Sequence, residues 1–593
     1  MNDSAPCIVL AAAHFLPGPD AVPLGAASVA SALKAAFCRS PAQPETGPAL
    51  RVSLAECTVA EGAPVLAERI MRNKPDFAGF SLYVWNRALM IEAALILRSR
   101  LPGIFLFCGG PEAGALPEGL SLNQGGPFDA VLIGEGEDAA VRLFRKLLGK
   151  GWKVPHGLSP QNPPAGEGLF PQSLPSQLAG LPSPWLDGTL KLYGRDGVLW
   201  ELGRGCPFGC IYCAESKGIA GITESGEGRK SAGTGRVRYF SDERIRQELH
   251  LFIKENIPYV FALDPTFNLD AKRAKAILDM IIRESESPGG RALKTRWHFE
   301  VRAELVDRGQ AARFARLGAS LQIGLQTADP RIAALIGRGF NRKRFEAGIS
   351  LINEAGVSFG LDLIYGLPGD RLEGYRTSLD YAFSLYPDNL DLFRLAVLPG
   401  TVLAEKAGPW RLRCQDKAPY EVLETPDFSA ADLEQAERLS AAAELFYNRG
   451  RAVAWFNQIL YPLHLKPSAF LEEFSLFVRR WPTGPHAEKD SASLNTAAII
   501  ELQLEFLKHC YERLHKPYLM RAVRDIVNFH GAWGKALAEG LETELSFTYQ
   551  PELVCGPEGM DIESFEQAYK PEPARYRMIC REERPELRRI GRR

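Results

Sequence analysis

Three cysteines stand close together in a glycine-rich segment, Glu201-Leu202-Gly203-Arg204-Gly205-Cys206-Pro207-Phe208-Gly209-Cys210-Ile211-Tyr212-Cys213. Their spacing is C-x3-C-x2-C, and the glycines and the proline let one short loop curl and aim three sulfurs inward. Three thiolates can hold three irons of a [4Fe–4S] cluster, which leaves the fourth iron open to a small molecule. Cys206, Cys210 and Cys213 are therefore the predicted cluster ligands. A zinc knuckle is the alternative, although zinc needs a fourth ligand and the sequence has no second C-x2-C.

The length and charge of the chain limit its class. At 593 residues it is too long for one ordinary domain, and 46% hydrophobic residues suffice for several cores. The 70 Lys and Arg residues balance 71 Asp and Glu residues, so no overall field favours nucleic acid or an anionic membrane. A cytoplasmic protein is predicted for three reasons. The remaining cysteines are scattered, no secretory signal accompanies the apolar run Cys7–Ala13, and no stretch is long enough to span a membrane. The basic end, Arg575–Arg593, is predicted to be a solvated tail.

Residues 1–150 alternate short apolar runs with longer amphipathic ones, which predicts a parallel, doubly wound α/β sheet of the Rossmann-like kind. The predicted strands are Cys7–Ala13, Arg51–Ala55, Phe77–Tyr83, Ile104–Cys108 and Ala130–Ile133, and the predicted helices are Leu24–Phe37, Gly62–Asn73, Arg87–Arg100 and Glu137–Leu148. Ligands of such sheets sit beyond the carboxyl ends of the strands. The turns Gly109-Gly110-Pro111-Glu112 and Gly134-Glu135-Gly136-Glu137 would let a large ligand approach the backbone there. Structural glycine turns are the alternative, and a nicotinamide site is disfavoured because no G-x-G-x-x-G follows the first strand.

The remaining chain divides into three further parts. Residues 151–194 are rich in Pro, Gly and Ser, which predicts an extended linker. In residues 195–425 strands are predicted at Leu199–Gly203, Tyr259–Asp264, Trp297–Arg302, Ser320–Gln326, Ser358–Tyr365 and Asp391–Val397. Six strand–helix units fit a partial (β/α)6 barrel with chemistry at the carboxyl ends of its strands. Residues 426–593 are predicted to be mainly α-helical with a short strand at Phe547-Thr548-Tyr549. They would form either a structural cap or a lid whose Trp455, Phe456 and Tyr461 line the substrate pocket.

The cysteine triplet, with the aromatic Tyr212 before its last member, resembles the cluster loop of the radical S-adenosylmethionine (radical SAM) enzymes. Polar residues then follow at the predicted strand ends, in Asp264–Asn268, His298–Arg302, Gly324–Thr327 and Asp362–Gly369. The ordered set Pro23-Leu24-Gly25, Gly79-Phe80-Ser81, Gly109-Gly110-Pro111 and Gly134-Glu135-Gly136-Glu137 looks like the cobalamin-binding domain that precedes many radical SAM barrels. Together these segments resemble the cobalamin-dependent radical SAM family over residues 5 to 405.

The resemblance implies three cofactors: a [4Fe–4S] cluster, SAM and cobalamin. For SAM it implies contacts with Tyr212, Asp264, Thr266, Glu300, Arg302, Gln326, Ile364, Gly366 and Leu367. For cobalamin it implies contacts with Pro23, Leu24, Ser81, Tyr83, Trp85, Asn86, Gly109, Gly110, Pro111, Glu112, Gly134, Glu135, Gly136 and Glu137. His14 stands where some cobalamin domains place a lower cobalt ligand in a D-x-H-x-x-G pattern. The Asp and the Gly of that pattern are missing here, so an ordinary loop histidine is predicted.

The resemblance further implies a methyltransferase. It would move a methyl group from SAM, by way of methylcobalamin, to an unactivated carbon from which a deoxyadenosyl radical has removed a hydrogen. Three alternatives stay open: a polar methylation without that radical, a cyclisation, rearrangement or oxidation without methyl transfer, and a non-catalytic corrinoid-binding sensor. The expected partners are a small-molecule or peptide substrate and an electron donor such as flavodoxin or ferredoxin, without nucleic acid. No residue of the sequence identifies the substrate.

Overall fold

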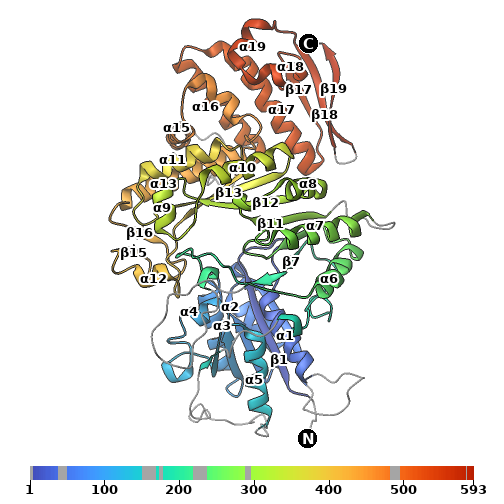
Figure 1. Ribbon diagram of the computed structural model, residues 1–593, viewed down its shortest axis with the longest axis vertical. Helices are drawn as coiled ribbons and strands as arrows, with labels where there is room; N and C mark the ends of the chain where they lie inside the picture. Colours follow the sequence, from blue (N-terminus) through green and yellow to red (C-terminus); the bar gives the residue numbers. More distant parts are fainter. Residues whose placement is uncertain are drawn as a thin grey trace.

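The computed structural model describes residues 5–37, 50–149, 169–171, 178–217, 237–286, 295–480, 494–581 and 584–592. An α/β unit, an open barrel and a mainly helical end follow one another along the long axis of the molecule (Figure 1). Of the predicted linker 151–194, residues 151–168 and 172–177 lie outside the described residues. Among the helices of the described ranges, none is long and apolar enough to cross a membrane.

The first unit is a six-stranded parallel sheet with helices on both faces. Its strands are β1 Cys7–His14, β2 Arg51–Thr58, β3 Phe77–Ser81, β4 Phe105–Gly109, β5 Ala130–Ile133 and β6 Leu169–Pro171. Its helices are α1 Leu24–Phe37, α2 Gly62–Met71, α3 Arg87–Arg100, α4 Pro111–Ala115 and α5 Gly136–Gly149. Strands β1, β3 and β4 are apolar except at their last residues, because α1 and α5 pack on one face and α2 and α3 on the other. The strand order β2-β1-β3-β4-β5-β6 confirms the doubly wound topology and places the ligand-binding crevice between β1 and β3.

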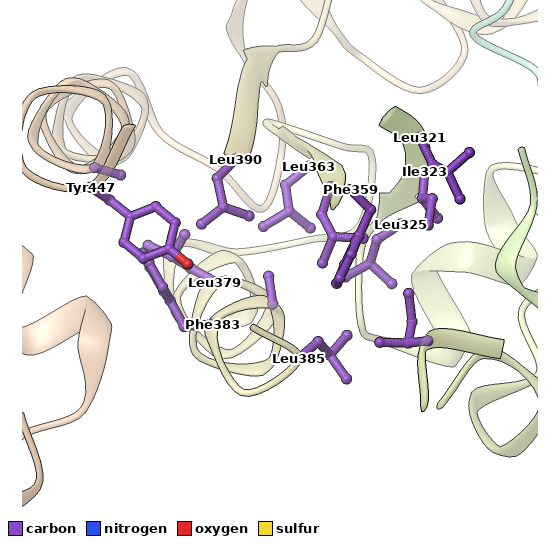
Figure 2. Close-up of a cluster of buried hydrophobic side chains, with 14 of the residues drawn as sticks. Leu321, Ile323, Leu325, Phe359, Leu363, Leu379, Phe383, Leu385, Leu390 and Tyr447 are labelled. Atoms are coloured by element: carbon purple, nitrogen blue, oxygen red, sulfur yellow. The ribbon is translucent and has the colours of Figure 1, made fainter. Parts of the chain in front are cut away.

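The second unit contains all six predicted barrel strands. They are β7 Val198–Trp200, β10 Tyr259–Ala262, β11 Arg296–Val301, β12 Ser320–Gln326, β13 Ser358–Tyr365 and β14 Asn389–Arg394. The helices are α6 Asp242–Lys254, α7 Ala271–Glu286, α8 Arg308–Leu317, α9 Pro330–Leu335, α10 Arg342–Glu354 and α11 Leu372–Phe383. Each strand is parallel to its neighbour in the order β14-β13-β12-β11-β10-β7, which is an open, partial barrel. Leu321, Ile323 and Leu325 of β12 belong to a buried cluster (Figure 2), so the alternate side chains Gln322 and Gln326 face the barrel interior.

Short paired strands and one short helix lie outside the two main sheets. β8 Gly203–Arg204 pairs with β9 Arg238–Tyr239, β15 Arg413–Cys414 pairs with β16 Val422–Glu424, and α12 is Val402–Lys406. β6 lies within the predicted linker yet pairs in parallel with β5. The side chains of Leu178, Trp185, Leu190 and Leu192 are buried in the barrel core. The extended-linker prediction is therefore wrong for residues 169–171 and 178–192, because apolar side chains and an open sheet edge outweigh a proline-rich composition.

The last third is helical, as predicted, except at its end. Its elements are α13 Ala430–Ala443, the π-helix η7 Glu444–Arg449, α14 Phe456–Leu460, α15 Pro467–Arg480, α16 Thr496–Arg513, α17 Met520–Glu539, α18 Pro551–Val554 and α19 Ile562–Ala568. The strands β17 Thr543–Phe547, β18 Ala574–Arg581 and β19 Arg584–Arg592 form an antiparallel sheet. The predicted solvated tail is thus wrong. Exposed Arg575 and Arg577 alternate with buried Tyr576 and Met578, a strand pattern that the charge density concealed.

The helical end covers the open edge of the barrel sheet. The side chain of Asn448 in η7 accepts a hydrogen bond from the backbone N–H of Leu390 (3.1 Å) and donates one to its carbonyl (2.9 Å). Trp455 and Phe456 are fully buried against aromatic neighbours, Tyr461 is mostly exposed, and none of the three lines the cavity described below. Of the two alternatives for these aromatics, Trp455 and Phe456 are core residues, because the apolar interior stabilises large rings more than a solvated pocket does.

Candidate active site

One cavity of about 2280 Å³ separates the carboxyl ends of the first sheet from the mouth of the barrel. Loops after β1, β3, β4 and β5 form one wall, and the cysteine loop together with the ends of β10, β11 and β12 forms the other. Ordinary ligand pockets measure about 300–1,000 Å³. This cavity therefore has room for more than one ligand, and the crevice of the first sheet faces the end of the barrel where chemistry is expected.

The cysteine loop is held from both sides. The N–H of Ile211 donates to the carbonyl of Ile336 (3.0 Å), and the carbonyl of Ile211 accepts from the N–H of Leu403 (2.9 Å). The Ser216 hydroxyl donates to the carbonyls of Cys210 (2.5 Å) and Cys213 (2.8 Å). Local hydrogen bonds and two distant segments thus fix the backbone that carries the sulfurs.

All three predicted cluster cysteines line the cavity, with Cys206 and Cys210 buried and Cys213 half-buried. Burial raises the pKa of the Cys213 thiol to about 11 and also raises the pKa of Cys206. Such thiols lose their protons when a metal cation binds them. Among the described residues, no three His, Cys, Asp or Glu side chains converge on a single metal ion. A [4Fe–4S] cluster does not need that convergence, because each thiolate binds its own iron.

Two polar residues at strand ends each have one side-chain oxygen without a hydrogen-bond partner among the described residues. Asp264 is buried, and its Oδ1 has no partner within the described part of the chain; burial raises its pKa to about 7. Gln326 follows a bulge in β12, has φ +69°, and its Oε1 is likewise unpartnered. A buried unpaired acceptor costs about 1–3 kcal/mol. Strained backbone and unpaired polar atoms gather at ligand sites, where a ligand donor completes them.

Acidic side chains continue into the barrel interior. Burial, with the nearby Asp362 carboxylate, raises the pKa of Glu300 to about 7. Burial also raises the pKa of Asp362 to about 6, although the Gln322 amide donates to it and to Asp391 (2.8 Å to Oδ2). Arg302 donates to the carbonyl of Gly339 (2.8 Å), and its guanidinium lies 3.9 Å from the centre of the Phe208 ring in the cysteine loop. Arg302 therefore supports the loop by a cation–π contact.

On the opposite wall, the loop after β3 is tied to the end of β1. Trp85 stacks on Tyr83 with ring centres 4.5 Å apart, and its Nε1 donates to the carbonyl of Ala13 (2.9 Å). The Asn86 side chain donates to the same carbonyl (3.1 Å) and accepts from the N–H of Tyr83 (2.8 Å). Trp85 stays 46% exposed, so its free ring face offers apolar surface to a ligand in the cavity.

Family comparisons assign both walls of this cavity. Residues 16–144 match the B12 binding domain, and residues 200–382 match the radical SAM superfamily. The chain is a cobalamin-binding radical SAM protein. The radical SAM domain implies a [4Fe–4S] cluster and SAM, and the B12-binding domain implies cobalamin.

Relatives of this cobalamin-binding radical SAM protein include named methyltransferases. TokK of Streptomyces tokunonensis, a cobalamin-dependent radical SAM methyltransferase, is 25% identical over 391 residues, which cover 62% of this chain and 54% of TokK. The hopanoid C-3 methylase of Methylococcus capsulatus is 28% identical over 312 residues, which cover 50% of this chain and 54% of that enzyme. The chain thus spans about half the length of these two curated relatives.

Two solved structures share its fold. OxsB, a cobalamin-dependent S-adenosylmethionine radical enzyme, aligns with a TM-score of 0.53 and 12% identity over 86% of this chain and 80% of OxsB. The radical SAM methyltransferase TsrM from Kitasatospora setae, with cobalamin and a [4Fe–4S] cluster bound, aligns with a TM-score of 0.50 and 15% identity over 70% of this chain and 76% of TsrM.

The residues that line the cavity of this cobalamin-binding radical SAM protein fit a [4Fe–4S] cluster, SAM and cobalamin. Soft cysteine sulfurs suit iron once the metal has displaced their protons, and the unpaired acceptor of Asp264 suits the ammonium group of SAM. On the other wall, Gly110 has φ +101°, and a Cβ atom there would lie 2.6 Å from the carbonyl oxygen of Leu82. The turn that borders the corrin wall therefore requires glycine.

The structure brings most predicted contact residues together around the cavity. All fourteen cobalamin residues line it, as do Tyr212, Asp264, Thr266, Glu300, Arg302 and Gln326 of the SAM set. Ile364, Gly366 and Leu367 do not line it. Leu367 is fully buried, and a Cβ atom on Gly366 would lie 2.8 Å from Val422. Their contact with SAM stays a prediction.

Some predicted cobalamin residues also bond to other parts of the protein. The carboxylate of Glu112 accepts a hydrogen bond from the Tyr420 hydroxyl (2.9 Å). His14, the last residue of β1, lines the cavity and lies 3.1 Å from Glu56 (Nε2 to Oε2), and its assignment as an ordinary histidine stays a prediction.

Sequence reasoning did not assign several charged residues of the cavity. They are Glu201, Arg204, Arg238, Arg338 and Asp362. For Arg338 a signal was present, because glycines flank it in Gly337-Arg338-Gly339. Arg204 and Arg238 gave no signal, because their partners are distant in sequence.

Proposed function

We propose that this protein is a methyltransferase that moves a methyl group from SAM, by way of cobalamin, to a carbon of a small-molecule or peptide substrate. The observation that carries the proposal is the single cavity, which reaches from the crevice between β1 and β3 to Cys206, Cys210 and Cys213. When bound, the cluster supplies one-electron cleavage of SAM and cobalamin supplies methyl carriage. The names of TokK and the hopanoid C-3 methylase support methyl transfer as the outcome.

In this proposal the side chains position and shield the cofactors. The three cysteine thiolates hold iron, Asp264 accepts hydrogen bonds from the SAM ammonium group, and Gln326 offers its free Oε1 to a hydroxyl donor. On the facing wall, Phe15 and Leu16 are each 64% exposed, and together with Trp85 they offer apolar surface to one face of the corrin. That surface limits the entry of water, which strengthens polar contacts inside the cavity.

A direct test uses protein reconstituted anaerobically with iron, sulfide and hydroxocobalamin. Incubated with SAM and titanium(III) citrate, it should release S-adenosylhomocysteine and 5′-deoxyadenosine, both measured by mass spectrometry. If the protein binds the corrinoid but releases neither product, it is a corrinoid-binding protein and the proposal is wrong. Once a substrate is found, a product heavier by one methylene unit per labelled methyl group supports methyl transfer. Loss of hydrogen without label would instead indicate oxidation or ring closure.

The affinity for SAM should rise with pH. Burial raises the pKa of Asp264 to about 7, so its ionised form, which attracts the ammonium group, grows from about pH 6 to about pH 7.5. Equilibrium dialysis should show the dissociation constant falling about fivefold to tenfold over this range, and Asp264→Asn should largely remove the trend. In the absence of SAM, the stability of the folded protein should change with pH in the opposite direction. Ionising a buried carboxyl costs stability, so its contribution is present below about pH 4 and is lost as the pH rises to about 7. A wild-type affinity that is flat or falls with pH contradicts this role.

A further inference from the structure

A two-stranded ribbon joins the cysteine loop to the B12-binding unit. In this ribbon Arg204 of β8 stands directly opposite Arg238 of β9. Like charges directly opposite in an antiparallel pair are destabilising unless a counter-charge separates them. Glu135 of the first unit supplies this negative charge. Its carboxylate accepts a hydrogen bond from Arg238 (3.2 Å, Nη1 to Oε2) and lies 3.4 Å from Arg204 (Nη1 to Oε2).

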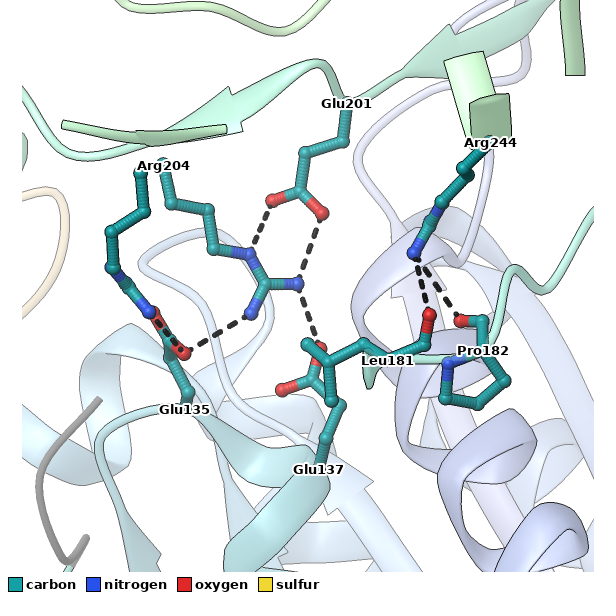
Figure 3. A network of polar contacts seen from close by, with 8 residues as sticks. Glu135, Glu137, Leu181, Pro182, Glu201, Arg204 and Arg244 are labelled. Atoms are coloured by element: carbon teal, nitrogen blue, oxygen red, sulfur yellow. Dashed lines mark hydrogen bonds and ion pairs between the residues drawn. The ribbon is translucent and has the colours of Figure 1, made fainter. Parts of the chain in front are cut away.

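Arg204 is the centre of the network (Figure 3). It donates two hydrogen bonds to Glu201 beside the cysteine loop (2.8 and 2.9 Å) and one to Glu137 of the B12-binding unit (2.7 Å). The side chains of Arg204 and Glu137 are only 17% and 6% exposed. Pairs buried to this degree are little screened, and removing one partner leaves the other charge uncompensated. The planar guanidinium, with its fixed fork of donors, therefore fixes the geometry of three carboxylates at once.

The network connects the two loops that matter to the cofactors. Glu135 and Glu137 flank Gly136 in the turn Gly134–Glu137, which lines the corrin side of the cavity. Arg204 stands two residues before Cys206, the first predicted cluster ligand. The contacts of Arg204 with Glu135 and Glu137 therefore link the cysteine loop to the facing wall of the cavity.

We propose that Arg204 is a positioning residue that fixes the distance between the corrin wall and the cysteine loop, and so governs methyl transfer from SAM to cobalamin. The inference rests on the proposed function. Transfer of the methyl cation to two-electron-reduced cobalt releases S-adenosylhomocysteine, and it requires both cofactors in near-attack geometry. Misplacement by about 1 Å can cost about 100-fold in rate. Cleavage of SAM by one cluster electron releases methionine and, after hydrogen uptake, 5′-deoxyadenosine, and it needs only the barrel side.

The test compares Arg204→Gln with Arg244→Gln. Arg244 also lies in a partly buried ion pair, with Glu248 (2.9 Å). It donates to the carbonyl of Leu181 (3.1 Å; Figure 3). Neither partner belongs to the B12-binding unit, which is matched over residues 16–144. Each protein is loaded with iron, sulfide and hydroxocobalamin and given SAM and titanium(III) citrate. For Arg204→Gln we expect S-adenosylhomocysteine formation to fall about 100-fold, with 5′-deoxyadenosine formation within about threefold of wild type. Arg204→Lys keeps the charge without the fork and should recover part of the loss. Arg244→Gln should change neither product.

A second readout needs no cofactor. In the protein without metal or corrinoid, Arg204→Gln should accelerate amide hydrogen exchange in residues 134–137 and 203–205, whereas Arg244→Gln should not. Equal losses of both products, or no loss of S-adenosylhomocysteine, overturn the positioning role. If wild-type protein forms neither product, the proposed function fails. Hydrogen exchange then decides whether Arg204 fixes the two loops, and unchanged exchange overturns that as well.

Discussion

Replacing Cys206, Cys210 and Cys213 together by alanine should abolish iron binding and SAM cleavage. These thiols are the only cysteines that line the cavity among the described residues, and each is expected to bind a separate iron. Iron and sulfide per chain, the visible absorbance of the cluster and 5′-deoxyadenosine formation should all fall to the level of protein that was never given iron.

The control for this triple change is Cys414→Ala. Cys414 is also half-buried, but it lies on β15 and does not line the cavity. Its replacement should leave iron content and SAM cleavage unchanged. Iron that stays bound after all three cavity cysteines are removed would show that the cluster is held elsewhere, and the assignment of the site would be wrong. Corrinoid binding should survive in the triple variant, which distinguishes loss of the cluster from loss of the fold.

Gly337→Ala should displace the cysteine loop although residue 337 carries no reactive group. A Cβ atom at this position would lie 2.2 Å from the carbonyl oxygen of Gly209, and Gly337 has φ +71°. Overpacking costs about 1–3 kcal/mol, and a left-handed backbone adds about 1–2 kcal/mol for a residue with a Cβ atom. We expect iron content to fall and the rate of 5′-deoxyadenosine formation to drop at least about tenfold, measured after identical reconstitution.

Gly339→Ala is the matched control, because a Cβ atom on Gly339 would have no neighbour within 4 Å. The two variants add the same methyl group two residues apart in the same segment. Equal activity in both would contradict the conclusion that close backbone contact between residues 209 and 337 holds the cluster loop.

The strands of the first sheet other than β6 could be predicted from sequence because buried parallel strands are nearly continuous apolar runs. All six barrel strands overlap their predicted positions, with β7 and β14 shifted by one to three residues at their ends. β6, β8 and β9 were not predicted, because pairs of two or three residues form through tertiary contact and leave no periodic pattern. β18 and β19 were not predicted for a different reason. Arginines on the solvent face dominate the composition of this segment, whereas Tyr576 and Met578 on the other face are buried.

The predicted site followed from the topology. Asp264, Glu300 and Gln326 end parallel strands, and the carboxyl ends of such strands meet at one mouth. The arginine network could not be foreseen, since Arg204 and Arg238 find Glu135 and Glu137 about 70 to 100 residues away. Gly366 and Leu367 lie away from the cavity for a similar reason: the chain after β13 packs against Val422 and Leu433, which the local sequence does not indicate.

The contact between Asn448 and Leu390 has a consequence for solubility. An open barrel, unlike a closed one, ends in a strand whose peptide groups can pair with another chain. Asn448 presents one amide to both polar groups of Leu390 and so mimics the missing seventh strand at one position. The π-helix η7 and the preceding helix α13 also contact β14. The helical third of the chain thus protects the barrel from self-association, and a fragment cut before residue 430 would expose a parallel edge that templates aggregation.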